Sequence, residues 1–310
     1  MSKRVLITGG TGMIGSHLIK KLIERGDHVK ILSRDMEKVH TIFKNHVNVK
    51  AIDLNKYKYP EQLSKIIEQT DIIINLAGAN VGDKRWSEEY KNEIRNSRIN
   101  ITRLLVDSIR LSENKPELLI SASGVGVYGF RGDEIITEDS KPGNDFLSKV
   151  CIDWEAEALK AEESGVRVSV IRTGIVLDKN DGALKELLIP FKFFAGVYQG
   201  DGKQWFSWIH IIDTVNLYLF VIENVNLKGA INGSSPDPVT NKELIKSISK
   251  FKKTVFTTSV PGFILKIAAG EFAENLLTGQ RVIPEKAENA GFKFMFPQLS
   301  DALKDLFNKN

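Results

Sequence analysis

The sequence predicts an α/β protein, built on a doubly wound parallel sheet with a smaller, mostly C-terminal α/β domain. Three observations predict this. Strand-like and helix-like segments alternate over the first 175 residues, several strand-like runs are apolar on both faces, and the alternation stops in the remaining chain. Strands that are apolar on both faces are typical of parallel sheets covered by helices. Regular alternation of strands and helices is typical of doubly wound folds.

Short β-rich runs mark the expected strands of the first unit, at 4–8, 29–32, 47–52, 71–76, 118–121 and 166–171. Apolar residues at helical spacing mark the helices between them, at 14–23, 61–69, 86–111 and 147–164. Later in the chain we expect helices at 211–223, 240–250, 284–290 and 299–308, and a strand at 229–232. We therefore expect a first domain over 1–175, to which 210–232 return, and a smaller unit over 176–310 that closes over what the first domain binds.

The composition is that of an ordinary globular protein and excludes several classes of partner. The 310 residues are 42% hydrophobic, and 43 basic against 39 acidic residues leave a net charge of only +4. The densest basic run, at 250–253, is too short for a nucleic-acid-binding face. The single cysteine, Cys151, cannot form an internal disulfide, and no zinc spacing occurs. Without a signal peptide or an apolar run of roughly 18 residues, we expect a cytoplasmic protein with no nucleic-acid, membrane or metal partner.

A glycine-rich turn follows the first expected strand. Its G-x-x-G-x-x-G spacing, between a strand and a helix, is typical of a dinucleotide-binding loop. The first glycine permits a tight turn, the second lets the backbone approach a pyrophosphate, and the third permits close packing of the helix, whose N-terminus attracts the anion. The alternative is an ordinary glycine-rich turn. The residues expected to bind the cofactor here are Gly9, Thr11, Gly12, Met13, Ile14 and Gly15.

The end of the second strand predicts which cofactor binds. Folds that prefer NAD place an acidic residue there, which binds the ribose 2′-hydroxyl. This chain has Ser33 and Arg34 instead. A guanidinium with a neighbouring hydroxyl suits a 2′-phosphate, so NADP (NADPH) is the predicted cofactor. Asp35 follows and is expected to point away; the alternative is that Arg34 is an ordinary surface arginine.

Two further loops leave the same edge of the predicted sheet. Asp53 and Leu54 follow the third strand, where an adenine can be recognised. Leu76, Ala77 and Gly78 follow the fourth strand, where small residues permit close approach of ribose and pyrophosphate. Each loop alone is equally well explained as a simple strand terminus. Because ligands of doubly wound folds bind outside the carboxyl ends of the strands, the loops together predict one cofactor site.

Segments spread along the whole chain match one known family; they are Thr8–Gly15, Asn75–Asn80, Lys84–Ser87, Arg95–Ile99, Ser121–Ser123, Tyr128–Gly129, Asp153–Glu155, Arg172–Leu177, Gln204–His210, Pro236–Asn241 and Gly279–Val282. The chain resembles the extended short-chain dehydrogenase/reductase superfamily, and within it the atypical "epimerase family protein" group. The resemblance implies a Rossmann-type fold, an NADP cofactor and cofactor contacts from Asn100 and Arg172. It also implies a homodimer paired through helices 86–111 and 147–164, and it names no substrate.

The catalytic pair of that superfamily is missing from this chain. Extended members carry Tyr-x-x-x-Lys on the helix after the fifth strand, where the ammonium and the cofactor lower the pKa of the phenol. No such pair occurs within 140–165. In one alignment Asp145 replaces the tyrosine and Lys149 keeps the position of the lysine. In the other alignment Phe146 and Val150 stand there.

Four residues are the catalytic candidates. Ser123 occupies the position of the superfamily serine and is expected to contact the substrate or the nicotinamide. Tyr128 is either a substitute proton donor or a packing group, and Asp145 is either a carboxylate base or the N-cap of the following helix. Lys149 is expected to hold the nicotinamide ribose. Two functions stay open: an NADP-dependent oxidoreductase or epimerase acting on a small molecule, or a non-catalytic NADP-binding sensor.

Overall fold

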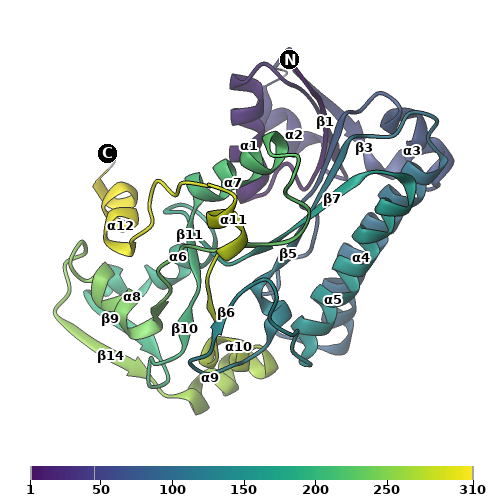
Figure 1. Cartoon of the computed structure of the whole chain (residues 1–310). Coiled ribbons are helices and arrows are strands. Elements are labelled where there is room, and N and C mark those ends of the chain that lie inside the picture. Colours follow the sequence, from purple (N-terminus) through teal and green to yellow (C-terminus); the bar gives the residue numbers. More distant parts are fainter. Residues whose placement is uncertain (1, 45, 309–310) are drawn as a thin grey trace.

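A computed structural model describes residues 2–44 and 46–308, which include a seven-stranded, entirely parallel sheet with helices on both faces (Figure 1). The strand order is β12-β7-β5-β4-β1-β2-β3, so the direction of winding reverses between β1 and β4. The predicted Rossmann-type doubly wound fold is confirmed. The strands are β1 (Arg4–Thr8), β2 (His28–Ser33), β3 (Val49–Asp53), β4 (Ile72–Asn75), β5 (Leu118–Gly124), β7 (Arg167–Thr173) and β12 (Gly229–Gly233).

Both faces of the sheet are buried, which explains why its strands lack a polar side. In β1, Val5 and Ile7 enter one core, whereas Leu6 enters the core on the opposite face. Consecutive side chains of a strand point to opposite faces, so each face needs its own apolar set. One face is covered by α1 (Met13–Glu24), α2 (Met36–Phe43) and α7 (Ile211–Glu223), and the other by α3 (Pro60–Ile67), α4 (Glu88–Leu111) and α5 (Phe146–Leu159).

The ends of the helices follow capping residues rather than apolar spacing. α4 begins two residues later than predicted, because the Ser87 hydroxyl accepts a hydrogen bond from Tyr90 N at 3.2 Å and caps the helix. The predicted helix 147–164 consists of α5 and a 3₁₀ turn at Lys160–Ser164. Helix α2 was not predicted, because its eight residues are too few to establish a clear period.

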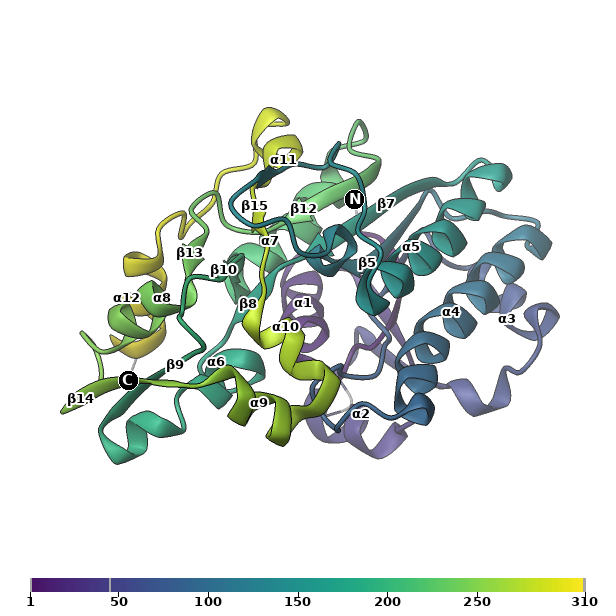
Figure 2. The ribbon, with the colours of Figure 1, turned by 90° about the horizontal axis from the view of Figure 1, so that it is seen from below.

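The later part of the chain forms a smaller α/β region beside the sheet (Figure 2). Its strands occur in two-stranded pairs, and one of them, β15, pairs with β6 from the first 175 residues. The predicted strand 229–232 is β12, which lies beside β7 in the central sheet. The domain boundary at 175 stays a prediction. The elements are β6 (Ile135–Ile136), β8 (Ile175–Leu177), α6 (Gly182–Leu187), β9 (Ala195–Gln199), β10 (Trp205–Phe206), β11 (Trp208–His210), β13 (Val239–Thr240), α8 (Asn241–Ile248), β14 (Phe256–Val260), α9 (Gly262–Ala269), α10 (Ala273–Leu277), β15 (Arg281–Val282), α11 (Glu285–Asn289) and α12 (Leu299–Asn308).

Candidate functional site

The three glycines of the first loop differ in what surrounds them. Gly9 has a φ of +67°, and a side chain there would lie 2.6 Å from Leu76 O. A side chain on Gly15 would lie 2.7 Å from Gly10 Cα. The protein's own packing therefore requires both glycines. At Gly12 the nearest atom to an added Cβ is Gly9 O at 3.4 Å, so the protein itself leaves room there.

The helix that follows this loop begins without a side-chain cap. Gly12 is the N-cap of α1, and the first turn of α1 contains no acidic residue. In contrast, α2 and α5 are capped by the carboxylates of Asp35 and Asp145, and α8 by the hydroxyl of Thr240. Uncapped N–H groups and the positive end of the helix dipole suit an anion. The space at Gly12 and the uncapped α1 together fit the pyrophosphate of a dinucleotide. Thr11, Met13 and Ile14 are partly exposed at the same loop.

At the end of β2, a basic and an acidic side chain follow each other, and they differ in their contacts. The Asp35 carboxylate accepts a hydrogen bond from Lys38 N at 2.9 Å and is thereby committed to capping α2. Arg34 is exposed, and its carbonyl oxygen accepts from Asn55 Nδ2 at 3.3 Å. The Ser33 hydroxyl bonds to the backbone of Asp35 at 3.1 Å. The charged group presented beyond the strand is therefore a guanidinium.

The loops after β3 and β4 lie at the same edge of the sheet. Asp53 Oδ1 accepts from Asn55 N at 3.0 Å, so this carboxylate stabilises the turn after β3, while Leu54 packs on the core. After β4, Leu76 N donates to Thr8 O at 3.2 Å, which ties this loop to the end of β1. Asn100 is exposed on α4. The remaining predicted contacts, Ala77 and Gly78, continue the loop after β4.

Ser123 lies at the carboxyl end of β5 in a buried ion-pair network. Its hydroxyl donates a hydrogen bond to Glu155 Oε1 at 2.7 Å. The Glu155 carboxylate also accepts from Arg172 Nε at 2.9 Å and from Arg172 Nη2 at 2.8 Å. Bidentate pairs of this kind are strong and directional. The Ser123 proton is therefore directed to a protein carboxylate, and Arg172 commits much of its guanidinium to the same network.

Tyr128 belongs to this network and is fully buried. Its hydroxyl donates to Asn232 Oδ1 at 2.6 Å and accepts from Arg172 Nη1 at 2.9 Å. Burial raises the pKa of the phenol to about 12. Because this hydroxyl both donates and accepts a hydrogen bond, it fixes the positions of Asn232 and Arg172. The raised pKa means that the phenol releases its proton less readily than usual.

Asp145 and Lys149 lie at the start of α5. The Asp145 carboxylate accepts from Ser148 N at 2.9 Å and caps the helix, one of the two roles that the sequence left open. Lys149 is exposed. Phe146, which takes the tyrosine's place in the second alignment, packs against Trp86 with ring centroids 5.0 Å apart. The structure thus brings together Ser123 and Tyr128, and it gives Asp145 a helix-capping contact.

Two members of the network were not among the predicted site residues. Glu155 is buried on α5, and its only sequence signal is its place in the matching segment Asp153–Glu155. Asn232 ends up beside Tyr128 although the two are 104 residues apart. Local spacing contains no signal for a partner at that distance.

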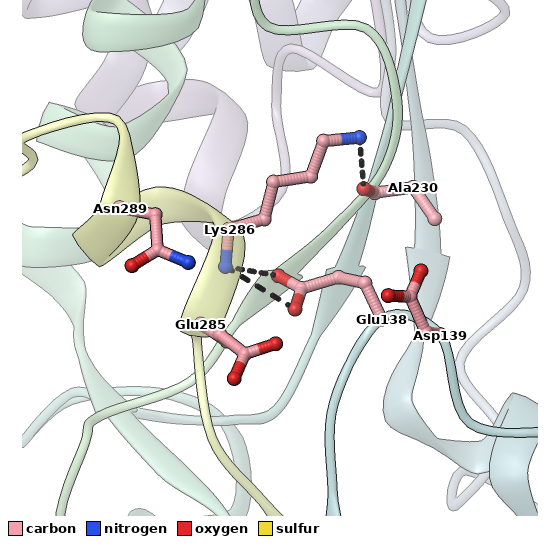
Figure 3. Close-up of a pocket in the computed structure, with 6 residues that line it drawn as sticks. All are labelled: Glu138, Asp139, Ala230, Glu285, Lys286 and Asn289. Carbon is pink, nitrogen blue, oxygen red and sulfur yellow. Dashed lines mark hydrogen bonds between the residues drawn. The ribbon is translucent and has the colours of Figure 1, made fainter.

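A separate hollow of about 390 Å³ lies beside the edge strand β12, lined by Glu138, Asp139, Ala230, Glu285, Lys286 and Asn289 (Figure 3). Its two central charged residues, Glu138 and Lys286, form hydrogen bonds within the protein. Both Glu138 carboxylate oxygens accept from Lys286 N at 3.3 Å, and Lys286 Nζ donates to Ala230 O at 3.1 Å. β7, β5 and β4 separate β12 from β1, so this hollow is distinct from the glycine loop.

Residues 2–44 and 46–308 contain no group of three or more His, Cys, Asp and Glu side chains placed to hold a metal ion. Among these residues, no helix has the length and apolar character needed to cross a bilayer.

Comparison with known sequences identifies the family. Residues 5–232 match the NAD-dependent epimerase/dehydratase family, and residues 260–306 match a domain of unknown function, DUF1731. The chain belongs to the NAD-dependent epimerase/dehydratase family. The chloroplastic epimerase family protein SDR39U1 homolog of Arabidopsis thaliana is 38% identical over 97% of this chain and 85% of its own length. Epimerase family protein YfhF of Bacillus subtilis is 38% identical over 97% of each chain.

Solved structures agree with this assignment. The crystal structure of human epimerase family protein SDR39U1 with NADPH has a TM-score of 0.87 and 30% identity, and the match covers 99% of this chain and 100% of that chain. UDP-glucuronic acid 4-epimerase of Bacillus cereus, in complex with UDP-glucuronic acid and NAD, has a TM-score of 0.78 over 98% of each chain, but at 19% identity it supports the fold alone. This member of the epimerase/dehydratase family is therefore of the extended short-chain dehydrogenase/reductase type, and the predicted "epimerase family protein" group is confirmed.

Proposed function

We propose that this epimerase family protein binds NADP(H) and acts as an oxidoreductase or epimerase on a small-molecule substrate. The observation that carries the proposal is the combination of free space at Gly12 with an α1 N-terminus that no side chain caps. Backbone N–H groups in this setting are what a pyrophosphate needs. The human relative, whose structure contains NADPH, supports the same cofactor.

The preference for NADP over NAD rests on the end of β2. Asp35 is engaged as the cap of α2, and Arg34 is exposed beyond the strand. In the proposal, Arg34 and Ser33 hold the 2′-phosphate. When bound, NADP(H) supplies or accepts a hydride. The other proposed contacts are the glycine loop for the pyrophosphate, Asp53 and Leu54 for the adenine, and Leu76, Ala77, Gly78, Asn100 and Arg172 along the rest of the cofactor.

Ser123 is the proposed catalytic residue. Its hydroxyl would contact the reacting oxygen of the substrate and pass a proton to Glu155, whose Oε1 lies 2.7 Å away. This route uses no phenol, which fits the absence of a Tyr-x-x-x-Lys pair from 140–165. Tyr128 and Asp145 support the site through the network and the cap of α5, and Lys149 is proposed to reach the nicotinamide ribose.

Calorimetry with NADPH and NADH tests the cofactor. We expect tighter binding of NADPH by the wild type, and a loss of about 1.5–3 kcal/mol in Arg34→Ala, because a charge-assisted contact disappears. Affinity for NADH should not change in this variant. Arg110→Ala, at the far end of α4, is the control and should bind both cofactors like the wild type. Equal affinity of the wild type for NADPH and NADH would refute the preference.

A second function, a cofactor-binding sensor with little turnover, is favoured by the closure of the polar network. Tyr128 is fully buried, and the Ser123 hydroxyl donates its hydrogen bond to a protein carboxylate, Glu155. Mass spectrometry of molecules that copurify with the protein, followed by NADPH oxidation assays with carbonyl and sugar-nucleotide substrates, separates the two functions. Tight NADPH binding with no oxidation across the panel would favour the sensor.

A further inference from the structure

Arg98 is a desolvated cation on α4 that no carboxylate of the described residues pairs with. Its guanidinium lies over the ring of Trp154, with Cζ 5.1 Å from the ring centroid. Within residues 2–44 and 46–308 its one hydrogen bond runs from Nη1 to Ile94 O at 2.8 Å. Burial lowers the pKa of Arg98. Removing a charge from water without a counter-charge is costly, so its position needs a reason.

Other partly buried arginines of this chain are better satisfied. Arg167 donates to four backbone carbonyl groups at 2.8–3.5 Å, and Arg172 donates to both carboxylate oxygens of Glu155. In the same described residues, Nε and Nη2 of Arg98 make no hydrogen bond, and neither atom is fully buried. Packing alone therefore uses only part of the hydrogen-bonding capacity of Arg98.

The unused part of this guanidinium lies at the candidate site. A side chain on Gly78 would lie 2.9 Å from Arg98 Cζ, so the absence of a side chain in the loop after β4 makes room for the arginine. Cys151 lies near Arg98 on α5: burial raises the pKa of its thiol to about 11, and both Ser123 and Arg98 act in the opposite direction. Arg98 is therefore located between the loop after β4 and the end of β5.

We propose that Arg98 binds an anionic oxygen group of the substrate, a carboxylate or a phosphate. This inference rests on the proposed function and adds the class of substrate: an anion whose charged group lies near Ser123. Arg98 is already held over an aromatic ring, so little side-chain freedom is lost when its fork of N–H groups binds an anion. The phosphates of the cofactor have the same chemistry, and the experiment must separate the two sources.

The test uses inorganic phosphate as the probe on the full chain, with and without saturating NADPH. Tm is measured as phosphate is added, and a chloride solution of equal ionic strength is the reference. The apparent affinity is the phosphate concentration at which Tm has risen by half of its maximal increase. We expect phosphate to stabilise the NADPH-saturated wild type. Arg98→Met should weaken this apparent affinity about tenfold or more, because charge-assisted hydrogen bonds are lost. NADPH affinity, measured by calorimetry, should stay within about twofold of the wild type.

Two further variants keep the test informative. Arg98→Lys keeps the charge but loses the fork, and we expect an intermediate phosphate affinity. Arg95→Met is the matched control on the same helix, because Arg95 is exposed and pairs with Asp153 at 2.8 Å. It should respond to phosphate like the wild type.

Three outcomes would overturn the proposal or assign the failure elsewhere. An equal phosphate response in the NADPH-saturated wild type and Arg98→Met would overturn it. The proposal would also be overturned if Arg98→Met lost NADPH affinity and the NADPH-saturated wild type did not respond to phosphate. Arg98 would then be assigned to the cofactor. If the wild type fails to bind NADPH, the proposed function is wrong. The phosphate response of the protein without NADPH, compared between the wild type and Arg98→Met, then shows whether Arg98 binds an anion.

Discussion

Ser123, Glu155, Arg172 and Tyr128 satisfy one another through hydrogen bonds at the end of β5. In a buried setting, each lost partner costs the desolvation energy of the group that remains. The network is therefore a rigid support at the carboxyl end of β5. Its chemistry differs from a tyrosine–lysine pair, because its serine directs its proton to a carboxylate.

Ser123→Ala tests the proposed catalytic role. We expect turnover to fall about 10²-fold or more, because the hydroxyl positions the reacting oxygen and transfers its proton. NADPH affinity should be retained. Ser169→Ala is the control, since the hydroxyl of Ser169 is buried in β7 but bonds to Leu227 O. Turnover of Ser123→Ala equal to that of the wild type, with a substrate in hand, would remove Ser123 from the mechanism.

Tyr128 predicts how stability depends on alkaline pH. Its pKa in the folded protein is about 12, above the ordinary value of 10, because the phenol is buried. Below pH 10 the phenol is neutral in both states; between pH 10 and 12 only the unfolded chain releases the proton, which favours unfolding. Stability should therefore decline over this range in the wild type.

Tyr128→Phe should lose about 1–3 kcal/mol at neutral pH, because Asn232 and Arg172 each lose a hydrogen-bond partner. Its further decline between pH 10 and 12 should be smaller than that of the wild type. Urea unfolding as a function of pH measures both effects. Tyr59→Phe, at an exposed position, is the control and should follow the wild type. Parallel alkaline declines for Tyr128→Phe and the wild type would contradict the assignment.

The turn from β1 into α1 combines structural and ligand requirements in one glycine pattern. Gly9 needs a positive φ and Gly15 needs close packing, whereas Gly12 has an ordinary backbone conformation and open space. The glycines of one regular sequence motif are thus required for different physical reasons. Only the position that the protein does not need for its own packing points to a bound ligand.

Gly12→Val and Gly15→Ala separate these causes. Gly12→Val should abolish NADPH binding while changing the free energy of unfolding by less than about 1 kcal/mol, because the new side chain occupies space meant for the pyrophosphate. Gly15→Ala should destabilise the fold by about 1–3 kcal/mol, because its Cβ would lie 2.7 Å from Gly10 Cα. Calorimetry and thermal unfolding measure the two quantities. Normal NADPH binding by Gly12→Val would mean that the loop is only structural.

At β12, the edge strand at the opposite side of the sheet from β3, segments that are far apart in the sequence are held together by hydrogen bonds. β15 pairs with β6, and Glu138 accepts from Asn232 N at 2.8 Å as well as from the first turn of α11. Lys286 in turn donates to Ala230 O in β12. These bonds pair backbone groups of an edge strand, which would otherwise offer a template for pairing with another chain.

We expect the protein to form a homodimer through α4 and α5, which pack side by side (Figure 1). Within the chain, the ion pairs Arg95–Asp153 at 2.8 Å and Arg103–Glu157 at 3.3 Å hold α4 against α5, so the two helices present one joint surface. Light scattering at micromolar protein should give twice the mass of the chain. Ile152→Arg, on α5, should give a monomer, and Val47→Arg, at an exposed loop, should not. A monomeric wild type would contradict the expectation.

Local patterns in the sequence were sufficient to predict the fold class and the glycine-rich turn between β1 and α1. Apolar strands, helical spacing and the glycine turn each depend on residues that are neighbours in the chain, and the sheet follows from their order. Apolar spacing did not fix the helix ends: α4 begins two residues later than predicted, because Ser87 caps it.

Tertiary structure alone decided which polar groups meet. Tyr128 and Asn232 are 104 residues apart, and Ser123 and Glu155 are 32 apart, so neither pair has a period that a sequence pattern reveals. The position of Arg98 against the loop after β4 also depends on how α4 packs on α5. A hydrogen bond between distant residues forms only after the sheet has set the distance between their elements, and this is why the Ser123–Glu155 contact and the surroundings of Arg98 were visible only in the folded chain.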